Sequence, residues 1–316
     1  GAIGGQSLPS LAPMLKQVMP AVVSVHTKQR VAVGNPYFDD PFFRRLFPQV
    51  PQERINESLG SGVIIDAARG YVLTNNHVIE GATEITATSL ADGRTYPVDV
   101  IGYDRTNDIA LVRLRGAGGL PVASLGTASA VSVGDPIAAI GNAGGGGGAP
   151  SFSPGTVTEL GAFVRASDES GGGARELTDL IRVAADVRPG DSGGPLVNSA
   201  GQVVGVTVAA TLTYRMGGVT GGEGFAIPID RALAVANQIR SGAASGTVHI
   251  GATAFIGVGI AELGHEVVLH PVDAGAVPEA FAGQGADVGH VFGRKARRQF
   301  DHHPAGVQFH VQQVGR

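Results

Sequence analysis

The sequence predicts an all-β protein built from two sets of short strands. From Gly60 to about Ile229, runs rich in Val, Ile and Thr alternate with Gly, Asn, Asp and Pro. Short strands at regular spacing, with turn residues between them, are typical of β-sandwiches and β-barrels. A break near residues 126–134 separates two sets of about six strands. The chain therefore has two all-β halves of similar size.

Two short helices are predicted, one before and one after these strands. In residues 8–19, apolar side chains recur at spacings of three and four, and Ser10 is the candidate N-cap. A strand is expected at 21–27. The second helix covers residues 231–241, with Asp230 as its candidate N-cap.

Three segments lack a regular pattern. Residues 35–58 contain four prolines and no steady period, so a mobile loop is predicted there. Five consecutive glycines at 144–148 are costly to order. The composition changes near Ile260, and residues 262–316 hold six of the nine histidines without an alternating strand pattern. A poorly ordered, solvated tail is therefore expected.

The composition is typical of a soluble globular protein. Hydrophobic residues make up 43%, charged residues 16%, and the formal net charge is −4. This balance argues against nucleic acid or an anionic membrane as a partner. No apolar run reaches the roughly 18 to 20 residues needed to span a bilayer. The chain has no cysteine, which excludes disulfides, a thiolate nucleophile and cysteine-based zinc sites. No cofactor is indicated.

The strongest functional signal is the segment GDSGGP at 190–195. A serine hydroxyl is a poor nucleophile at neutral pH and needs a neighbouring base. The glycine-rich turn lets the side chain of Ser192 project. It also aims the backbone N–H groups of Gly190 and Ser192 at one point, where an oxyanion would form. The plainer alternative is a glycine-rich β-turn that happens to contain a serine.

A base and an orienting acid are expected elsewhere in the chain. His77 follows the strand-like run YVLT, and Asp108 precedes the strand-like run IALVRL. Taken singly, such a histidine is more often an ordinary polar residue, and such an acid is more often a turn cap. Together with Ser192 they stand in the order His, Asp, Ser, each at a strand–turn junction. This is the chymotrypsin order and differs from the subtilisin and α/β-hydrolase orders, so a catalytic triad is predicted.

Six motifs, taken in order, resemble the HtrA/Deg family of serine proteases. They read GSGVIID, GYVLTNNHVIEGA, TNDIALVRL, VGDPIAAIGN, PGDSGGPLVNSAGQVVGV and GFAIPID. The resemblance covers roughly residues 8–260. Two stretches, GYDRTNDIALVRLRGAGGLP and VHIGATAFIGVGI, are more similar to the secreted mycobacterial PepA-type branch.

The resemblance implies a chymotrypsin-like double six-stranded β-barrel with the active site between the barrels. Position by position, it makes His77 the base, Asp108 the orienting acid and Ser192 the nucleophile. The oxyanion hole falls on the N–H groups of Gly190 and Ser192. The implied activity is the hydrolysis of unfolded or extended polypeptides in protein quality control. Export to the periplasm, cell envelope or exterior is also implied, as is a homotrimer in which the loop at 35–58 is regulatory.

The domain organisation expected from pattern and resemblance has four parts. They are a lead-in helix at 1–20, a first barrel at 21–130, a second barrel with its closing helix at 131–245, and a linker and tail at 246–316. Members of the family usually carry a PDZ domain after the protease, and here the tail stands in its place. A histidine-based metal site is a rival interpretation of the tail, but no H-x-x-x-H or H-E-x-x-H spacing supports it.

The segment before the nucleophile also departs from the family. The sequence reads VAADVRPG, so an acid stands at Asp186, six residues before Ser192. Trypsin-like enzymes place the acid of the primary specificity pocket there, which would favour basic residues before the cleaved bond. The family prefers small aliphatic ones, and the alternative is that Asp186 faces solvent or a structural partner. Asp191 occupies a position where the family often has Asn, and nothing indicates zymogen activation.

An extended substrate is expected to add as a strand beside residues 204–210. Val206, Thr207 and Val208 are therefore candidate substrate-binding residues. Two rivals to proteolysis stay open: a chaperone or peptide-binding protein on the same fold, and an intact triad held inactive by a misregistered loop.

Overall fold

The computed structural model describes residues 12–32, 53–142, 150–167, 174–208, 222–251, 258–263 and 266–271. The candidate cap Ser10 and the glycine run at 144–148 lie outside these residues. The chain divides into two compact units, Gly1–Ala252 and Thr253–Arg316, which are described separately below.

The first barrel consists of six antiparallel strands. They are β1 (Val22–Ala32), β2 (Glu53–Asp66), β3 (Tyr71–Thr74), β4 (Glu84–Ser89), β5 (Thr95–Asp104) and β6 (Ile109–Leu114). Their order in the sheet is β5-β4-β1-β2-β3-β6, and the pairing of β5 with β6 closes the barrel. A further strand, β13 (Val248–Ile250), pairs with β5 from outside this ring.

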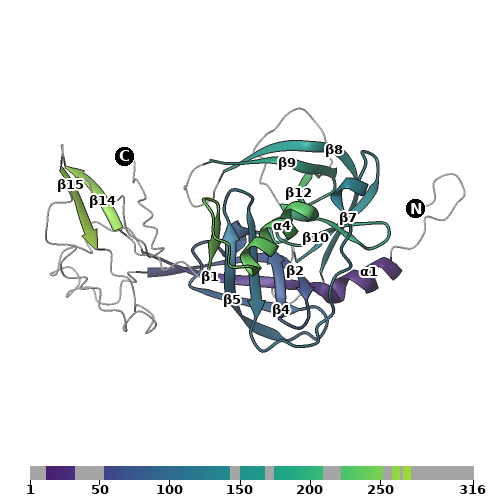
Figure 1. The fold of residues 1–316 in the computed structure, drawn as a ribbon, viewed down its shortest axis with the longest axis horizontal. Coiled ribbons are helices and arrows are strands. Elements are labelled where there is room, and N and C mark those ends of the chain that lie inside the picture. Colours follow the sequence, from purple (N-terminus) through teal and green to yellow (C-terminus); the bar gives the residue numbers. More distant parts are fainter. Residues whose placement is uncertain are drawn as a thin grey trace, which may run out of the picture. The chain divides into compact units, whose positions relative to one another are not determined.

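The second barrel is also closed and six-stranded, with the order β10-β11-β12-β9-β8-β7. In Figure 1 its strands β8, β9 and β12 lie above β1, β4 and β5 of the first barrel. Its strands are β7 (Pro136–Gly141), β8 (Ser151–Ser167), β9 (Ala174–Ala184), β10 (Pro195–Asn198), β11 (Val203–Val208) and β12 (Gly224–Pro228). The predicted all-β, chymotrypsin-like double barrel is thus confirmed.

Within the described residues, the helices are few and short. They are α1 (Ala12–Val18), η1 (Met19–Ala21), α3 (Asn76–Ile79), η2 (Ala128–Ala130) and α4 (Ile229–Arg240). In the described part of the chain, none combines the length and apolarity that a bilayer crossing requires. The prediction that Asp230 caps the last helix was wrong, because α4 already begins at Ile229 and Pro228 is its N-cap. The Asp230 carboxylate instead accepts a hydrogen bond from the Ala128 N–H at 2.6 Å.

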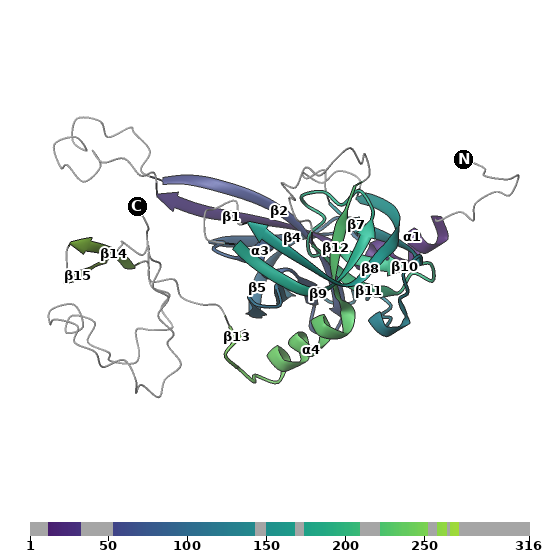
Figure 2. The same cartoon turned by 90° about the horizontal axis from the view of Figure 1, so that it is seen from above.

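Strand β2 begins earlier than the sequence indicated. Residues 53–58, assigned to the mobile loop, pair with β1 from Ala32 opposite Glu53 to Thr27 opposite Ser58. Figure 2 shows these two strands running side by side away from the barrel. Side chains from Arg54 to Leu59 are all exposed, on both faces of the ribbon. Because neither face is buried, no alternation of polar and apolar residues marks this strand.

The second unit contains an antiparallel hairpin of β14 (Val258–Leu263) and β15 (Glu266–Pro271). The expectation of no strand after residue 262 was therefore wrong for 266–271. The three consecutive apolar residues Val267–Leu269 hide any two-residue period there. Residues 272–316 lie outside the described part.

One apolar core joins the two barrels within the first unit. Buried side chains of the first barrel, such as Val63 and Leu111, belong to the same cluster as Ile140 and Val206 of the second. Helix α4 adds Ile239 to this cluster, and the helix contacts β5 and β6 of one barrel and β11 of the other. The two halves of the candidate site are thus carried on one continuous packed body.

Truncation of the second-barrel core should destabilise this body. Leu196 on β10 is fully buried, so Leu196→Ala should lower the free energy of unfolding by about 2–5 kcal/mol through lost burial and a cavity. The matched control is Leu160→Ala on β8, where the side chain is 45% exposed and a change within about 0.5 kcal/mol is expected. Urea unfolding followed by circular dichroism measures both. Equal losses would contradict the placement of Leu196 in the core.

Candidate active site

His77 lies directly after the first barrel's strand β3. The strand ends at Thr74, and the single-turn helix α3 then carries His77 in its first turn. The imidazole is 30% exposed, so it is reachable from solvent while its backbone is held in the helix. This placement follows from the sequence, because the apolar run of β3 stops at the polar residues Asn75 and Asn76.

Asp108 faces His77 from the turn before β6. Its side chain is 1% exposed, and its carboxylate accepts two hydrogen bonds from His77. The His77 backbone N–H donates to Oδ1 at 2.9 Å, and the ring Nδ1 is 2.7 Å from Oδ2. An ionised carboxylate only accepts, so this contact is a hydrogen bond when the ring proton lies on Nδ1. The other ring nitrogen, Nε2, then carries the lone pair that a general base needs.

The backbone at Asp108 is itself unusual. Its φ is +53°, in the left-handed region that non-glycine residues seldom adopt. Asn75 Nδ2 donates to the Asp108 carbonyl at 3.0 Å, and the Asn76 N–H donates to it at 3.2 Å. These two bonds hold the turn in a conformation that aims the carboxylate at His77.

The turn that carries Ser192 is tight and depends on glycine. Ser192 is 4% exposed, between Gly190 at φ +96° and Gly193 at φ +86°. A side chain at Gly193 would come within 2.2 Å of the Ser61 carbonyl oxygen and 2.4 Å of Thr74 Oγ1. Glycine is therefore required for both conformation and space at this position. The turn consequently packs against the end of β3, three residues before His77.

Ser61 on β2 binds this turn to the first barrel. Its N–H donates to the Ser192 carbonyl at 2.7 Å, and its hydroxyl donates to the Gly190 carbonyl at 2.7 Å. The same hydroxyl accepts the Asn142 N–H at 3.0 Å, and the Ser61 carbonyl accepts the Thr74 hydroxyl at 2.7 Å. The structure thus brings His77 and Asp108 into contact and places the Ser192 turn beside the segment that leads to His77.

Asp186 is exposed and paired. Its side chain is 57% exposed, and its carboxylate accepts hydrogen bonds from the Arg188 guanidinium, at 2.8 Å from Nε. These bonds, the charge of Asp186 and the charge of Asp191 raise the pKa of Arg188 above its ordinary value. A pocket acid that selects basic residues needs an unpaired carboxylate, so this arrangement favours the alternative in which Asp186 faces solvent and a structural partner.

The candidate substrate strand is largely occupied. Val206, Thr207 and Val208 are buried, and β11 pairs with β12 along one edge. On the other edge, Val206 lies opposite Pro195 of β10, and the Thr207 N–H donates to the Gly194 carbonyl at 2.8 Å. Val206 and the Thr207 amide therefore cannot receive a substrate strand, which corrects the sequence prediction. The Thr207 carbonyl accepts the Gly193 N–H at 2.9 Å and has a second lone pair. Residues 209–221 lie outside the described part.

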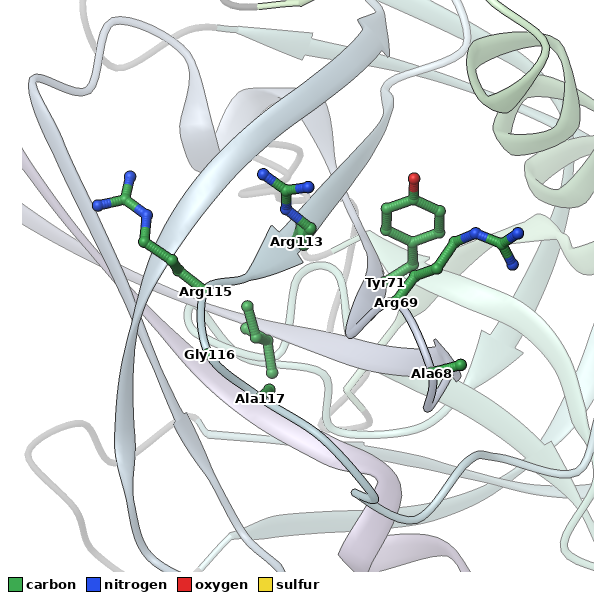
Figure 3. Close-up of a pocket in the computed structure, with 8 residues that line it drawn as sticks. Ala68, Arg69, Tyr71, Arg113, Arg115, Gly116 and Ala117 are labelled. Carbon is green, nitrogen blue, oxygen red and sulfur yellow. The ribbon is translucent and has the colours of Figure 1, made fainter.

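Two cavities lie among the described residues, and neither is lined by His77, Asp108 or Ser192. One of about 420 Å³ lies on the first barrel, where Arg69, Arg113 and Arg115 line it with Tyr71 (Figure 3). Hydrogen bonds from Arg115 and Arg113 lower the pKa of the neighbouring Asp99 carboxyl. The other cavity, about 310 Å³, lies beside the nucleophile turn and is lined by Ser151, Phe152, Ser153, Pro154, Asp186 and Arg188. No three His, Asp and Glu side chains in the described part are grouped to hold a metal ion.

The double barrel, with a His–Asp pair on one barrel and a GDSGGP turn on the other, defines the trypsin-like class of peptidases. In agreement, the family described as "Trypsin-like peptidase domain" matches residues 60–206. A solved structure of a variant of the HtrA-type protease AlgW with a decapeptide is 33% identical, with a TM-score of 0.60, over 81% of this chain and 72% of that one. The chain therefore belongs to the HtrA/Deg family of serine proteases.

Curated relatives agree with this family. A putative serine protease HhoA of Synechocystis sp. is 41% identical over 237 residues, which are 72% of this chain and 55% of that protein. The periplasmic pH-dependent serine endoprotease DegQ of Escherichia coli is 38% identical over 76% of this chain and 50% of that protein. The chain thus spans about half the length of the curated relatives it matches. The similarity to the PepA-type branch stays a prediction.

Sequence reasoning missed two residues that shape the site. Ser61 lies in the GSGVIID motif and Asn75 lies two residues before His77, but no role was predicted from the sequence for either residue. The available signal was a polar residue inside or directly after an otherwise apolar strand, since a buried polar group needs partners. The identity of those partners could not be predicted, because they lie on strands distant in the sequence.

Removal of the Ser61 hydroxyl should weaken the joint between the barrels. In Ser61→Ala, the buried Gly190 carbonyl and Asn142 N–H each lose a partner, so the free energy of unfolding should fall by about 1–3 kcal/mol. Ser58→Ala, on the exposed part of the same strand, should change it by less than about 0.5 kcal/mol. Urea titration of both variants tests this. A Ser61 variant as stable as the parent would contradict the role of the hydroxyl.

Proposed function

We propose that the chain is a serine endopeptidase in which His77, Asp108 and Ser192 form the catalytic triad. The observation that supports this most directly is the double hydrogen bond from His77 to the buried Asp108 carboxylate. It sets both the tautomer and the orientation of the imidazole beside a serine on a glycine-rich turn. An ordinary polar histidine would need neither.

The proposed reaction is acyl transfer from a peptide bond. The Ser192 hydroxyl attacks the carbonyl carbon, and His77 Nε2 takes the hydroxyl proton. Asp108 keeps the imidazole in place and stabilises its charged form. His77 then gives the proton to the leaving amine, and water repeats the sequence on the acyl-enzyme to release the second product and regenerate Ser192.

Negative charge on the carbonyl oxygen needs donors already in place. We assign these to the backbone N–H groups of Gly190 and Ser192. The Ser61 hydroxyl and the Asn142 N–H engage the Gly190 carbonyl, and the Ser61 N–H engages the Ser192 carbonyl. These bonds hold the 190–191 and 192–193 peptide units, which flank the unit that carries the Ser192 N–H. The carbonyl of that unit, from Asp191, accepts the Gly194 N–H at 3.0 Å. Such preorganisation supports this assignment.

The proposed substrates are unfolded or extended polypeptides. A substrate segment would add beside the end of β11, from the Thr207 carbonyl onward, and be held mainly through its backbone. Binding of this kind suits broad proteolysis in protein quality control. Because relatives are named as periplasmic serine endoproteases, we further propose export to the periplasm or envelope. A homotrimer is proposed from the family resemblance, and sedimentation equilibrium tests it.

Replacement of the nucleophile should abolish proteolysis without unfolding the protein. Unfolded β-casein should be cleaved by the parent and not by Ser192→Ala, whose rate should fall by at least about 10³-fold. Ser199→Ala, an exposed serine in the turn after β10, should cleave at the parental rate. Gel electrophoresis and mass spectrometry measure the products. Equal cleavage by the Ser192 variant would remove this residue from the mechanism.

The two rivals give different outcomes in the same assay. If neither the parent nor the variant cleaves casein, a phosphonate reagent directed at nucleophilic serines separates them. Labelling of Ser192 would indicate an intact triad that a misregistered loop holds inactive toward casein. Absence of labelling, together with casein binding, would indicate a chaperone or peptide-binding protein.

Asp186 should not select basic residues. The family resemblance implies cleavage of casein mainly after small aliphatic residues. Because the Asp186 carboxylate is exposed and bound to Arg188, we expect Asp186→Asn to leave this preference unchanged. The matched control is Asp179→Asn, which also removes an exposed carboxylate bound to an arginine. Mass-spectrometric mapping of the cleaved bonds decides the question. Cleavage after Arg or Lys that disappears only in the Asp186 variant would contradict this expectation.

A further inference from the structure

Asp191 lies between the two proposed oxyanion donors, Gly190 and Ser192, and is almost fully buried at 1% exposure. Its backbone helps to define the turn, because its N–H donates to the Arg188 carbonyl at 3.0 Å and its carbonyl accepts the Gly194 N–H at 3.0 Å. Any displacement of Asp191 must therefore move Ser192 and both donors. The proposed site depends on what holds this one residue.

The side chain of Asp191 has little room to move. A side chain at Gly141 would come within 2.5 Å of Asp191 Oδ1 and 2.6 Å of its Cα. One carboxylate oxygen, Oδ2, accepts the Arg188 N–H at 2.9 Å, and the other, Oδ1, accepts the hydroxyl of Ser151. A buried carboxylate is costly unless donors compensate it. The Arg188 donor is a backbone N–H, which most substitutions leave in place. The Ser151 donor is a side-chain hydroxyl on β8, so a single substitution removes it.

We propose that Ser151, the first residue of β8, is a positioning residue: its hydroxyl anchors the Asp191 carboxylate and thereby holds the nucleophile turn in its reactive conformation. This inference deepens the proposed function and, for its effect on catalysis, rests on it. The anchored group is a carboxylate in a nearly fully buried place. A charged side chain in the same buried place needs the hydroxyl donor more than a neutral amide does.

The neighbouring Ser153 provides a matched control. It lies on the same strand, and its hydroxyl donates at 2.7 Å to the Asp186 carbonyl in the segment before the nucleophile. Ser153→Ala therefore removes one serine hydroxyl that joins β8 to the same loop but does not touch Asp191. A general weakening of β8 would affect both serine variants alike, whereas a role through the carboxylate would separate them.

The experiment uses the full chain and a fluorescent phosphonate that labels Ser192. Ser151→Ala should slow labelling about 10- to 100-fold, the effect of one lost hydrogen bond to a charged group. Ser153→Ala should stay within about threefold of the parent. Ser151→Thr, which retains the hydroxyl, should recover most of the rate. When Asp191→Asn is already present, adding Ser151→Ala should slow the labelling of Ser192 much less, because no charged group then loses its donor.

Hydrogen exchange followed by mass spectrometry tests the anchor without requiring activity. Faster exchange at the Asp191 and Gly194 amides is expected in Ser151→Ala and not in Ser153→Ala. If the parent is not labelled, the proposed function fails, and the exchange data still decide whether Ser151 anchors the turn. Equal labelling and exchange in the two serine variants would overturn the inference. The inference would also be overturned if Ser151→Ala slowed labelling as strongly in the Asp191→Asn variant as in the parent.

Discussion

The backbone and hydroxyl of Ser61 join the two barrels at the point where the proposed nucleophile stands. Its N–H and hydroxyl reach the carbonyls of Ser192 and Gly190, and its own carbonyl receives the Thr74 hydroxyl. Apolar packing brings the barrels together but is not directional, so it cannot set the orientation of a peptide group. Hydrogen bonds to a fully buried serine can, because a broken bond there is not replaced by water.

Each barrel contributes one incomplete part of the site. The first barrel builds the His77–Asp108 pair locally, with Asp108 held in the left-handed region by Asn75 and Asn76. Such an unfavourable backbone conformation persists only where its surroundings determine it, and here the closed barrel does so. The second barrel builds the Ser192 turn on glycines with positive φ. Neither part alone holds both the proposed base and the proposed nucleophile, so the proposed reaction requires the contacts that Ser61 makes between the barrels.

The prediction of the fold succeeded where burial leaves a pattern in the sequence. Strands such as β6 and β11 are buried along nearly their whole length and read as short apolar runs between turn residues. It failed for residues 53–58 of β2, which are exposed on both faces, and at Asp230, whose carboxylate bonds to Ala128 and not to its own helix. These features are stabilised by distant partners, and local residue patterns carry no record of such partners.

The sequence by itself determined the class of fold, the family and the three residues proposed for catalysis, because these depend on strand periodicity and on short contiguous motifs. Only the tertiary structure decided what holds those residues. It showed that Val206 and the Thr207 amide are already occupied by other strands. It also showed that Asp186 is exposed and that the Asp191 carboxylate accepts the Ser151 hydroxyl. Each of these findings concerns either a contact between segments that are distant in the sequence or the solvent exposure of a side chain. Both are determined only when the barrels have closed and packed.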